Sequence, residues 1–142
     1  MRVVIFIKAD KDTEAGNMPS EDQLAAMGKF NEDLVNAGIM LAGEGLHPSS
    51  RGKRVVLTNS KTTVTDGPFS ETKEIVCGFW IWQVKSMEEA VEWVKRIPKP
   101  TLSAESVIEI RQVFEAEDFG AEYTPELRAH DEKLREKIQA RS

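Results

Sequence analysis

The sequence predicts an α+β fold of the ferredoxin-like type, in which one antiparallel sheet carries two helices on one face. Short runs rich in β-branched and aromatic residues alternate with two longer segments of helical periodicity. Their order is strand, helix, strand, hairpin, strand, helix, strand, which is a split βαβ sandwich with an extra hairpin. The length of 142 residues suits about one domain.

The strands are predicted from apolar runs that are too short to be independent helices. They are expected at residues 2–9, 39–46, 54–58, 62–66, 75–84 and 107–114. The third and fourth runs flank Asn59-Ser60-Lys61 and are expected to form the hairpin. Within the second run, Gly43 and Gly45 predict a bulge or a close backbone approach around Glu44.

Each of the two helices begins at a Ser followed three residues later by Gln or Glu, which is a capping box. The pairs are Ser20 with Gln23 and Ser86 with Glu89. The first helix is expected to end at Ala37, with Gly38 as its stop, and Pro98 and Pro100 end the second.

Residues 115–142 differ in character from the predicted domain at 1–114. Thr124-Pro125 is a typical helix start. The following helix is mostly charged, with a thin apolar stripe at Leu127, Leu134 and Ile138. Such a stripe buries too little surface to hold a helix alone, so we expect this extension to dock on the domain or on a partner chain.

Composition narrows the function classes. The net charge of −5 and the pI near 5.2 argue against a nucleic-acid partner, whose phosphates are bound by excess Lys and Arg. The single cysteine, Cys77, cannot form an internal disulfide and is expected to be a small core residue in a reducing compartment. The sequence contains no apolar segment of membrane-spanning length and no signal-peptide pattern. We therefore expect a cytoplasmic protein with no membrane partner.

A homodimer is expected from the number of sheet faces that need cover. The runs at residues 3–7 and 75–82 are apolar on both faces, whereas a sheet with one wet face alternates apolar and polar residues. Two helices cover one face only. Soluble monomers avoid a large exposed apolar patch, so a second copy is expected to cover the other face.

Several motifs in fixed order resemble those of the DGPF proteins of the YCII-related family. They are AGEGL at 42–46, VTDGPF at 64–69, ETKE at 71–74, GF at 78–79, EAVEW at 89–93, RIP at 96–98 and VIEIR at 107–111. The resemblance covers about residues 1–114, and a pattern with this many parts is more specific than one short motif. It implies a dimeric α/β barrel in which two sheets face each other.

The resemblance is weaker for activity. The wider YCII family is associated with a His near the start of the first helix and an Asp just before the Pro that follows the second. Here the first helix contains no His, and Lys95, Arg96 and Ile97 precede Pro98. Related families on this barrel include lyases, isomerases and cofactor-free oxygenases, and fold does not choose among them. DGPF proteins also resemble products encoded beside extracytoplasmic-function sigma factors, which implies a regulatory alternative.

Three residues are candidates for acid–base catalysis. Glu44 lies between two glycines in an apolar strand, and a carboxylate in an apolar cleft has the raised pKa that a general base needs. Its alternative role is structural, as a bulge cap or a partner of Arg111. Asp66 can act in the same way or simply form the Asp-Gly-Pro turn. His47 carries an imidazole, the side chain best suited to proton transfer, but equally suits an exposed loop.

Four residues are candidates for binding a substrate. Arg111 can clamp a carboxylate or phosphate, or form a salt bridge with Glu44, Glu74 or Glu109. Lys73 offers a second positive charge, with Glu74 beside it at the same strand entrance. Trp80 belongs to the core or the dimer interface, or it lines a pocket.

No metal or cofactor is expected. The two histidines and one cysteine show no metal-ligand spacing, and no dinucleotide or nucleophile motif occurs. The basic cluster Arg51-Gly52-Lys53-Arg54 is expected to be solvated. The sequence therefore predicts a small-molecule pocket between two sheets with acid–base chemistry of the lyase or isomerase type on a ligand, perhaps anionic, or else a non-catalytic module that contacts a regulatory protein.

Overall fold

The structure is a computed structural model that describes residues 1–99 and 105–141. Internal contacts divide the chain into two units, Met1–Gln112 and Val113–Ser142. The described elements of the first unit are β1 (Arg2–Lys8), α1 (Lys11–Glu14), α2 (Glu21–Asn36), β2 (Met40–Gly45), η1 (Ser49–Arg51), β3 (Lys53–Leu57), β4 (Thr62–Asp66), η2 (Thr72–Glu74), β5 (Val76–Gln83), α3 (Met87–Val94) and β6 (Ile108–Gln112). Those of the second are η3 (Ala116–Asp118) and α4 (Pro125–Ala140).

The main sheet has the strand order β2-β5-β1-β6, and every neighbouring pair is antiparallel. The two strands that flank the first helix, β1 and β2, are therefore separated by β5. This is the ferredoxin-like arrangement, and the predicted fold class is confirmed. In the register of the sheet, Ile5 lies opposite both Trp80 and Ile110.

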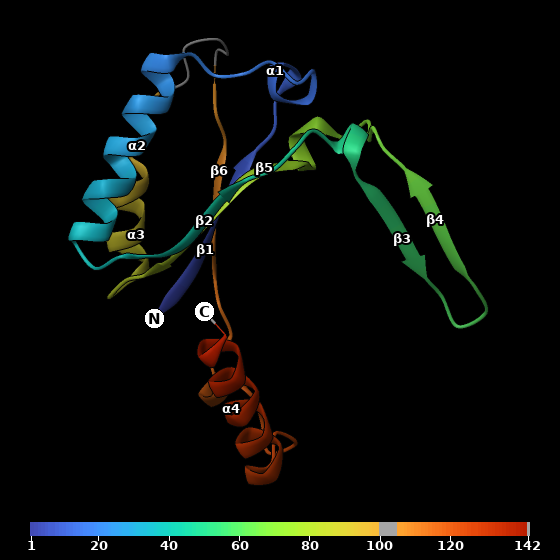
Figure 1. Cartoon of the computed structure of the whole chain (residues 1–142). Coiled ribbons are helices and arrows are strands. Elements are labelled where there is room, and N and C mark those ends of the chain that lie inside the picture. The colour runs from blue at the N-terminus through green and yellow to red at the C-terminus, as the bar shows by residue number, and fades with distance from the viewer. Residues whose placement is uncertain (100–104, 142) are drawn as a thin grey trace. The chain divides into compact units, whose positions relative to one another are not determined.

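Helices α2 and α3 lie on the same face of the sheet (Figure 1). The buried core on this face combines strand and helix side chains: Val3, Ile5, Trp80, Trp82, Phe30, Leu34 and Ala90. Trp82 is fully buried, and the ring centroids of Phe30 and Trp80 are 5.7 Å apart in an edge-to-face arrangement. Two helices on one face were predicted, and this is confirmed.

The opposite side of the sheet, which we call the open face, is also apolar. Opposed residues of an antiparallel pair share a face, and Val4 lies opposite Ile81 while Phe6 lies opposite Phe79. All four side chains are partly exposed in the single chain. Within the first unit, α2 and α3 pack on the other face, so the excess of apolar residues noted in the sequence lies on the open face.

The glycines of β2 behave partly as expected. The irregularity of the ladder lies between Met40 and Ala42, so the bulge predicted around Glu44 is in the wrong place. The close approach is confirmed at Gly43, where an added Cβ would stand 2.5 Å from the Trp80 ring. Glycine is needed here because the indole packs directly on the strand backbone.

The first capping box is confirmed and the second is modified. Ser20 Oγ accepts from the amide of Gln23 at 3.2 Å, and Gln23 Oε1 accepts from the amide of Ser20 at 2.8 Å. Ser86 likewise caps the amide of Glu89 at 3.1 Å, but Glu89 Oε1 accepts from the amide of Lys85 at 3.2 Å rather than that of Ser86. The reciprocal bond therefore shifts by one residue.

The short helix α1 was missed because the sequence there was read as a polar connection. Asp10 caps the Thr13 amide at 2.9 Å, and Thr13 Oγ1 accepts from the Asp10 amide at 2.9 Å. This is the capping-box spacing with Thr in place of Glu or Gln. The helix places Glu14 where it contacts the segment that follows β2.

The hairpin β3–β4 forms a separate two-stranded sheet that lies away from the main sheet (Figure 1). Its register pairs Val55 with Val64, as expected for the predicted hairpin. Every residue of both strands is exposed in the single chain. Because an isolated two-stranded hairpin is at best marginally stable, contacts at its base must fix its position.

In the second unit, α4 begins at Thr124, which caps the Leu127 amide at 3.3 Å, and has Pro125 in its first turn. Tyr123 donates to Asp131 at 2.6 Å, and its ring lies 5.1 Å from that of Phe119. The predicted apolar stripe is exposed at Leu127, Leu134 and Ile138. None of the described helices has the length and apolarity required to cross a membrane.

Candidate functional site

A cavity of about 800 Å³, which we call the edge cavity, lies beside β2 at the edge of the main sheet. Its polar lining includes Thr13, Asn31, Glu44, His47, Arg51 and Cys77. Its apolar lining includes Ile7, Met18, Met27, Leu46, Phe79 and Trp80. A concave, mostly apolar space of this size with a few converging polar groups is typical of small-molecule sites.

The edge cavity brings together three of the seven residues predicted as site residues, namely Glu44, His47 and Trp80. Glu44 lies opposite Phe79 in the ladder and therefore belongs to the open face, whereas Trp80 points to the helix side. The cavity thus reaches around the sheet edge from one face to the other.

Trp80 has a dual role. Its ring is 4% exposed and packs in the core, while its Nε1–H donates to Asn31 Oδ1 at 2.9 Å. Both residues line the edge cavity, so one wall is held rigidly by a core side chain. The two alternatives for Trp80, core and pocket, are both realised.

His47 has a partner that the sequence did not suggest. Arg51 Nη1 lies 3.2 Å from Nδ1 and 3.1 Å from Nε2 of the imidazole. An atom equally close to both ring nitrogens cannot lie in the ring plane, where Cε1 stands between them. Arg51 therefore meets the face of the imidazole through Nη1, and its Nε and Nη2 groups have no other partner among the described residues.

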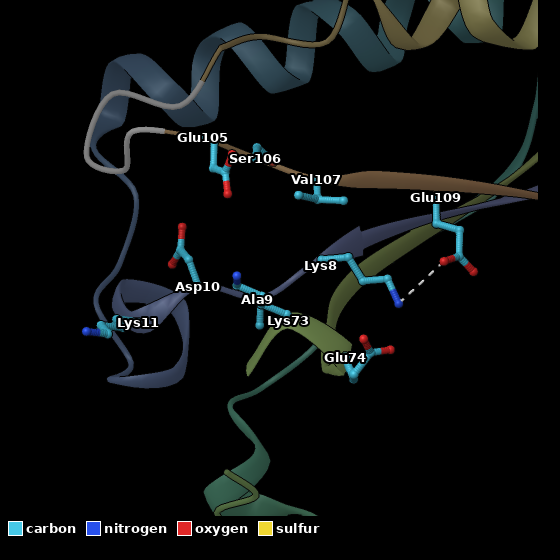
Figure 2. A pocket seen from close by; sticks show the side chains of 10 residues that line it. All are labelled: Lys8, Ala9, Asp10, Lys11, Lys73, Glu74, Glu105, Ser106, Val107 and Glu109. Carbon is cyan, nitrogen blue, oxygen red and sulfur yellow. Dashed lines mark ion pairs between the residues drawn. The ribbon is translucent and has the colours of Figure 1, made fainter. Parts of the chain in front are cut away.

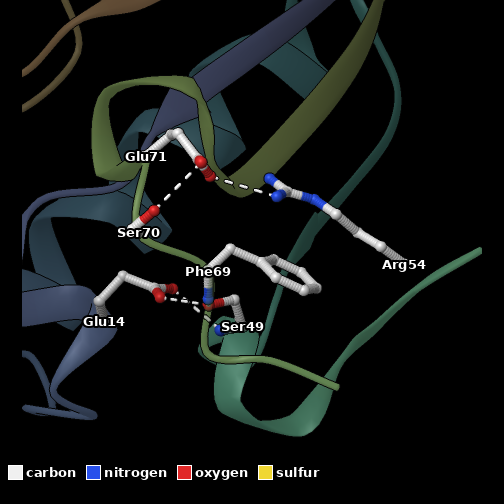
Figure 3. A network of polar contacts seen from close by, with 6 residues as sticks. All are labelled: Glu14, Ser49, Arg54, Phe69, Ser70 and Glu71. Atoms are coloured by element: carbon white, nitrogen blue, oxygen red, sulfur yellow. Dashed lines mark hydrogen bonds and ion pairs between the residues drawn. The ribbon is translucent and has the colours of Figure 1, made fainter. Parts of the chain in front are cut away.

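The segment that carries His47 and Arg51 is anchored through Ser49, whose hydroxyl is buried. Ser49 N–H donates to Glu14 Oε1 at 2.9 Å and Ser49 Oγ donates to Glu14 Oε2 at 2.5 Å. The same Oγ accepts from the Phe69 amide at 3.0 Å. Figure 3 shows Glu14, Ser49 and Phe69 in this arrangement, which we call the anchor network.

The Asp-Gly-Pro-Phe turn has a structural role in this network. Gly67 N–H donates to Gly52 O at 3.0 Å, and a Cβ on Gly67 would stand 1.7 Å from the Ser49 carbonyl oxygen. Only glycine fits this approach of two backbones. Asp66, predicted as a catalytic candidate or a turn former, is exposed and pairs with Lys53 at the base of the hairpin, away from the edge cavity.

Arg54, although exposed, contacts two residues at the base of the hairpin. Its guanidinium lies 4.0 Å over the Phe69 ring and its Nη1 is 3.1 Å from Glu71 Oε2 (Figure 3). The pKa of Glu71 is held below its usual value by a hydrogen bond from its own backbone, and next by Arg54 and Ser70. The basic cluster at 51–54 is exposed to solvent, as expected, and Arg51, Lys53 and Arg54 each also have a defined partner.

Lys73 and Glu74 line a different cavity, of about 510 Å³, together with Lys8 and Glu109 (Figure 2). Lys8 Nζ reaches toward Glu109 at 3.8 Å. Arg111 pairs with Glu109 at 3.4 Å, which is one of the salt bridges considered from the sequence. The structure therefore places Lys73, Glu74 and Arg111 apart from the edge cavity.

Within residues 1–99 and 105–141, no group of three or more His, Cys, Asp or Glu side chains is placed to hold a metal ion. The edge cavity instead offers one carboxylate, one imidazole, one thiol and one guanidinium among its described lining residues. These groups can transfer protons and bind an anion.

The model of the YCII-related domain matches residues 1–117 of this sequence. The chain belongs to the YCII-related family. No curated protein matches this YCII-related chain. Among solved structures it is similar to 5-chloro-2-hydroxyhydroquinone dehydrochlorinase (TftG) from Burkholderia phenoliruptrix AC1100, in complex with 2,5-dihydroxybenzoquinone, with 18% identity and a TM-score of 0.39 over 84% of this chain and 100% of that one. The family expected from the motifs is thus confirmed.

Several residues of this YCII-related site were not singled out from the sequence. Ser49, Arg51 and Asn31 lie outside any motif of catalysis, and Cys77 was expected in the core. Arg51 follows His47 by four residues, and the turn η1 brings their side chains together, a contact that no helical spacing in the sequence predicts. Because Arg51 belongs to a basic cluster that was expected to be solvated, the sequence did not indicate it as a site residue.

Proposed function

We propose that this chain is a homodimeric, cytoplasmic small-molecule enzyme whose edge cavity performs acid–base chemistry without a cofactor. The observation that supports this is the convergence of Glu44 and His47 on one apolar-walled cavity of about 800 Å³. A carboxylate and an imidazole are the commonest pair for removing a proton from one atom of a ligand and returning it to another. Lyase and isomerase reactions both begin with such a transfer.

The second copy has a role in this proposal. Glu44 and Phe79 line the cavity from the open face, which a second chain would cover. Covering that face would close the cavity on one side and exclude water from Glu44. The proposed site therefore lies between two sheets, in the dimer that the family resemblance implies.

The test is proton exchange with solvent. A metabolite panel is first screened by thermal shift, because a ligand that binds only the folded chain raises its stability by mass action. Each hit is then incubated with the protein in D2O, and NMR detects replacement of a ligand C–H by C–D. We expect exchange that falls about 100-fold or more in Glu44→Gln or His47→Gln.

Matched controls are present in the chain. His130 is exposed on α4 and Glu32 is exposed on α2, so His130→Gln and Glu32→Gln repeat the chemical changes away from the cavity. Both controls are expected to retain the exchange rate. Exchange that is equally fast in all four variants would contradict the catalytic assignment.

A second candidate function is non-catalytic contact with a regulatory protein, an extracytoplasmic-function sigma factor if the family resemblance holds. It is favoured by the exposed stripe of Leu127, Leu134 and Ile138 on α4. Size-exclusion chromatography of the chain mixed with such a factor tests it. Co-elution that is lost in the Leu134→Glu, Ile138→Glu double variant is the supporting result, and separate elution of the unaltered proteins contradicts it.

A further inference from the structure

Arg51 has no carboxylate partner within the described ranges, although acidic residues outnumber basic ones, 24 to 19. Its neighbours Lys53 and Arg54 are both paired, with Asp66 and Glu71. Arg51 instead contacts His47 through Nη1, and its Nε and Nη2 groups have no hydrogen-bond partner among the described residues. A guanidinium offers a fork of parallel N–H groups that matches a carboxylate.

The backbone that carries Arg51 is held in place before any ligand arrives. The buried Ser49, two residues earlier, is bound to Glu14 of α1 and to the amide of Phe69. Arg51 N–H also donates to Pro48 O at 3.0 Å, which closes the turn η1. Only the rotamer freedom of the Arg51 side chain is then lost on binding, and not that of the backbone.

The rest of the edge cavity limits the charge and the shape of a ligand. Arg51 is the single Lys or Arg, and Glu44 the single carboxylate, among its described lining residues. A dianion would gain one strong partner and be repelled by Glu44, so one negative charge fits best. Met27, Leu46 and Phe79 are partly or fully exposed and offer apolar surface suited to a flat, unsaturated body.

We propose that the ligand of the edge cavity is a small planar monocarboxylate, bound by its carboxylate in a bidentate pair with Arg51. This inference rests on the proposed function, because it names the ligand class of the same cavity. It also assigns anion recognition to Arg51, whereas the sequence had suggested Arg111 and Lys73. Arg111 is already paired with Glu109, and Lys73 lines the other cavity.

The experiment compares 2-naphthoate with its neutral analogue 2-naphthamide and with the dianion 2-naphthyl phosphate. Affinities are measured by calorimetry on the full chain. Protection of the single cysteine, Cys77, from iodoacetamide reports whether binding occurs in the edge cavity, since Cys77 lines it. We expect naphthoate to bind about tenfold more tightly than either analogue, through the charge-assisted pair.

Arg51→Gln is expected to bring the affinities for naphthoate and naphthamide within about twofold of each other, and Arg51→Lys to keep part of the difference. The control Arg141→Gln removes the same charge at the exposed end of α4 and is expected to leave the preference intact. Thermal unfolding of Arg51→Gln checks that the exposed substitution leaves the chain folded.

The possible results separate the two proposals. Equal binding of naphthoate and naphthamide with protection of Cys77 overturns the anion assignment while the cavity remains a binding site. A preference that survives in Arg51→Gln but is lost in Arg111→Gln also overturns it. Tighter binding of the phosphate contradicts the carboxylate class. If none of the compounds protects Cys77 at millimolar concentration, both the ligand class and the small-molecule function of the cavity are contradicted.

Discussion

Cys77 illustrates how a single residue acquires its properties from its surroundings. Expected in the core, it is instead half-buried in the wall of the edge cavity, where its Sγ lies 3.7 Å from Lys8 O. Burial is the main reason that the pKa of this thiol is raised above its usual 9.0, and Thr13 opposes the change by a hydrogen bond. A neutral thiol at neutral pH is a wall group and not a nucleophile.

Alkylation of Cys77 by iodoacetamide is predicted to be slower in the folded chain than in urea at every pH from 7 to 10. The thiolate reacts, and the folded state disfavours it. The contribution of Cys77 to the free energy of unfolding is full below pH 9.0, where the thiol is neutral in both the folded and the unfolded chain. It is lost as the pH rises through the higher pKa of the folded state, because the unfolded chain ionises more readily. Mass spectrometry of timed samples measures both rates. Equal rates in the folded and unfolded chains at pH 8 would contradict the raised pKa.

At the scale of elements, the Asp-Gly-Pro-Phe turn joins the hairpin to the cavity wall. Gly67 lies against the Ser49 backbone, and the Phe69 amide binds the Ser49 hydroxyl. The segment that contains Ser49 also carries His47 and Arg51, which line the edge cavity. The Asp-Gly-Pro-Phe turn therefore does not line the cavity itself, but holds in place the segment that bears two of its candidate functional groups.

Gly67→Ala is predicted to lower the free energy of unfolding by about 1–3 kcal/mol, because its Cβ would overlap the Ser49 carbonyl oxygen at 1.7 Å. Gly28→Ala is the matched control. It lies in α2 with no atom within 4 Å of the added Cβ, and is predicted to stabilise the chain by about 0.5–1 kcal/mol. Urea unfolding followed by tryptophan fluorescence measures both. If the Gly67→Ala variant were as stable as the natural chain, the close approach of Gly67 to the Ser49 backbone would not require glycine.

At the scale of the whole molecule, the apolar surface of the first unit is unevenly covered. Val3 and Ile5 are buried under α2 and α3, whereas Val4 and Phe6 on the same strand remain partly exposed on the open face. Burial of apolar surface stabilises by about 25 cal/mol per Å², so covering this face with a second copy is favourable. The homodimer remains a proposal that this face supports.

Ile81→Lys is predicted to convert the dimer to a monomer, because it places a charge in the middle of the open face opposite Val4. Light scattering at micromolar concentration should give twice the chain mass of 15.9 kDa for the natural sequence and a single mass for the variant. Leu24→Lys, at an exposed apolar position on α2, is the control and should leave the mass unchanged. A measured mass of one chain for the natural sequence would contradict the dimer.

The sequence by itself determined the fold class and part of the site. The short apolar strand runs, the Ser20 capping box and Gly38 report local energetics, which act over a few residues, and all were found in place. Glu44 and His47 were found because a charged or titratable residue beside an apolar strand is visible locally. Helix α1 was missed because its cap uses Thr13 in place of the usual Glu or Gln.

Only the tertiary structure decided which groups meet. The contacts of Ser49 with Glu14 and Phe69 span 35 and 20 residues, and the bond between Trp80 and Asn31 spans 49. Such pairs arise when the sheet and its helices bury their shared core, so no local pattern encodes them. For the same reason the structure separated Asp66, Lys73 and Arg111 from the edge cavity and placed Arg51 in it. Among the basic side chains, packing and not charge decided which one lines the cavity.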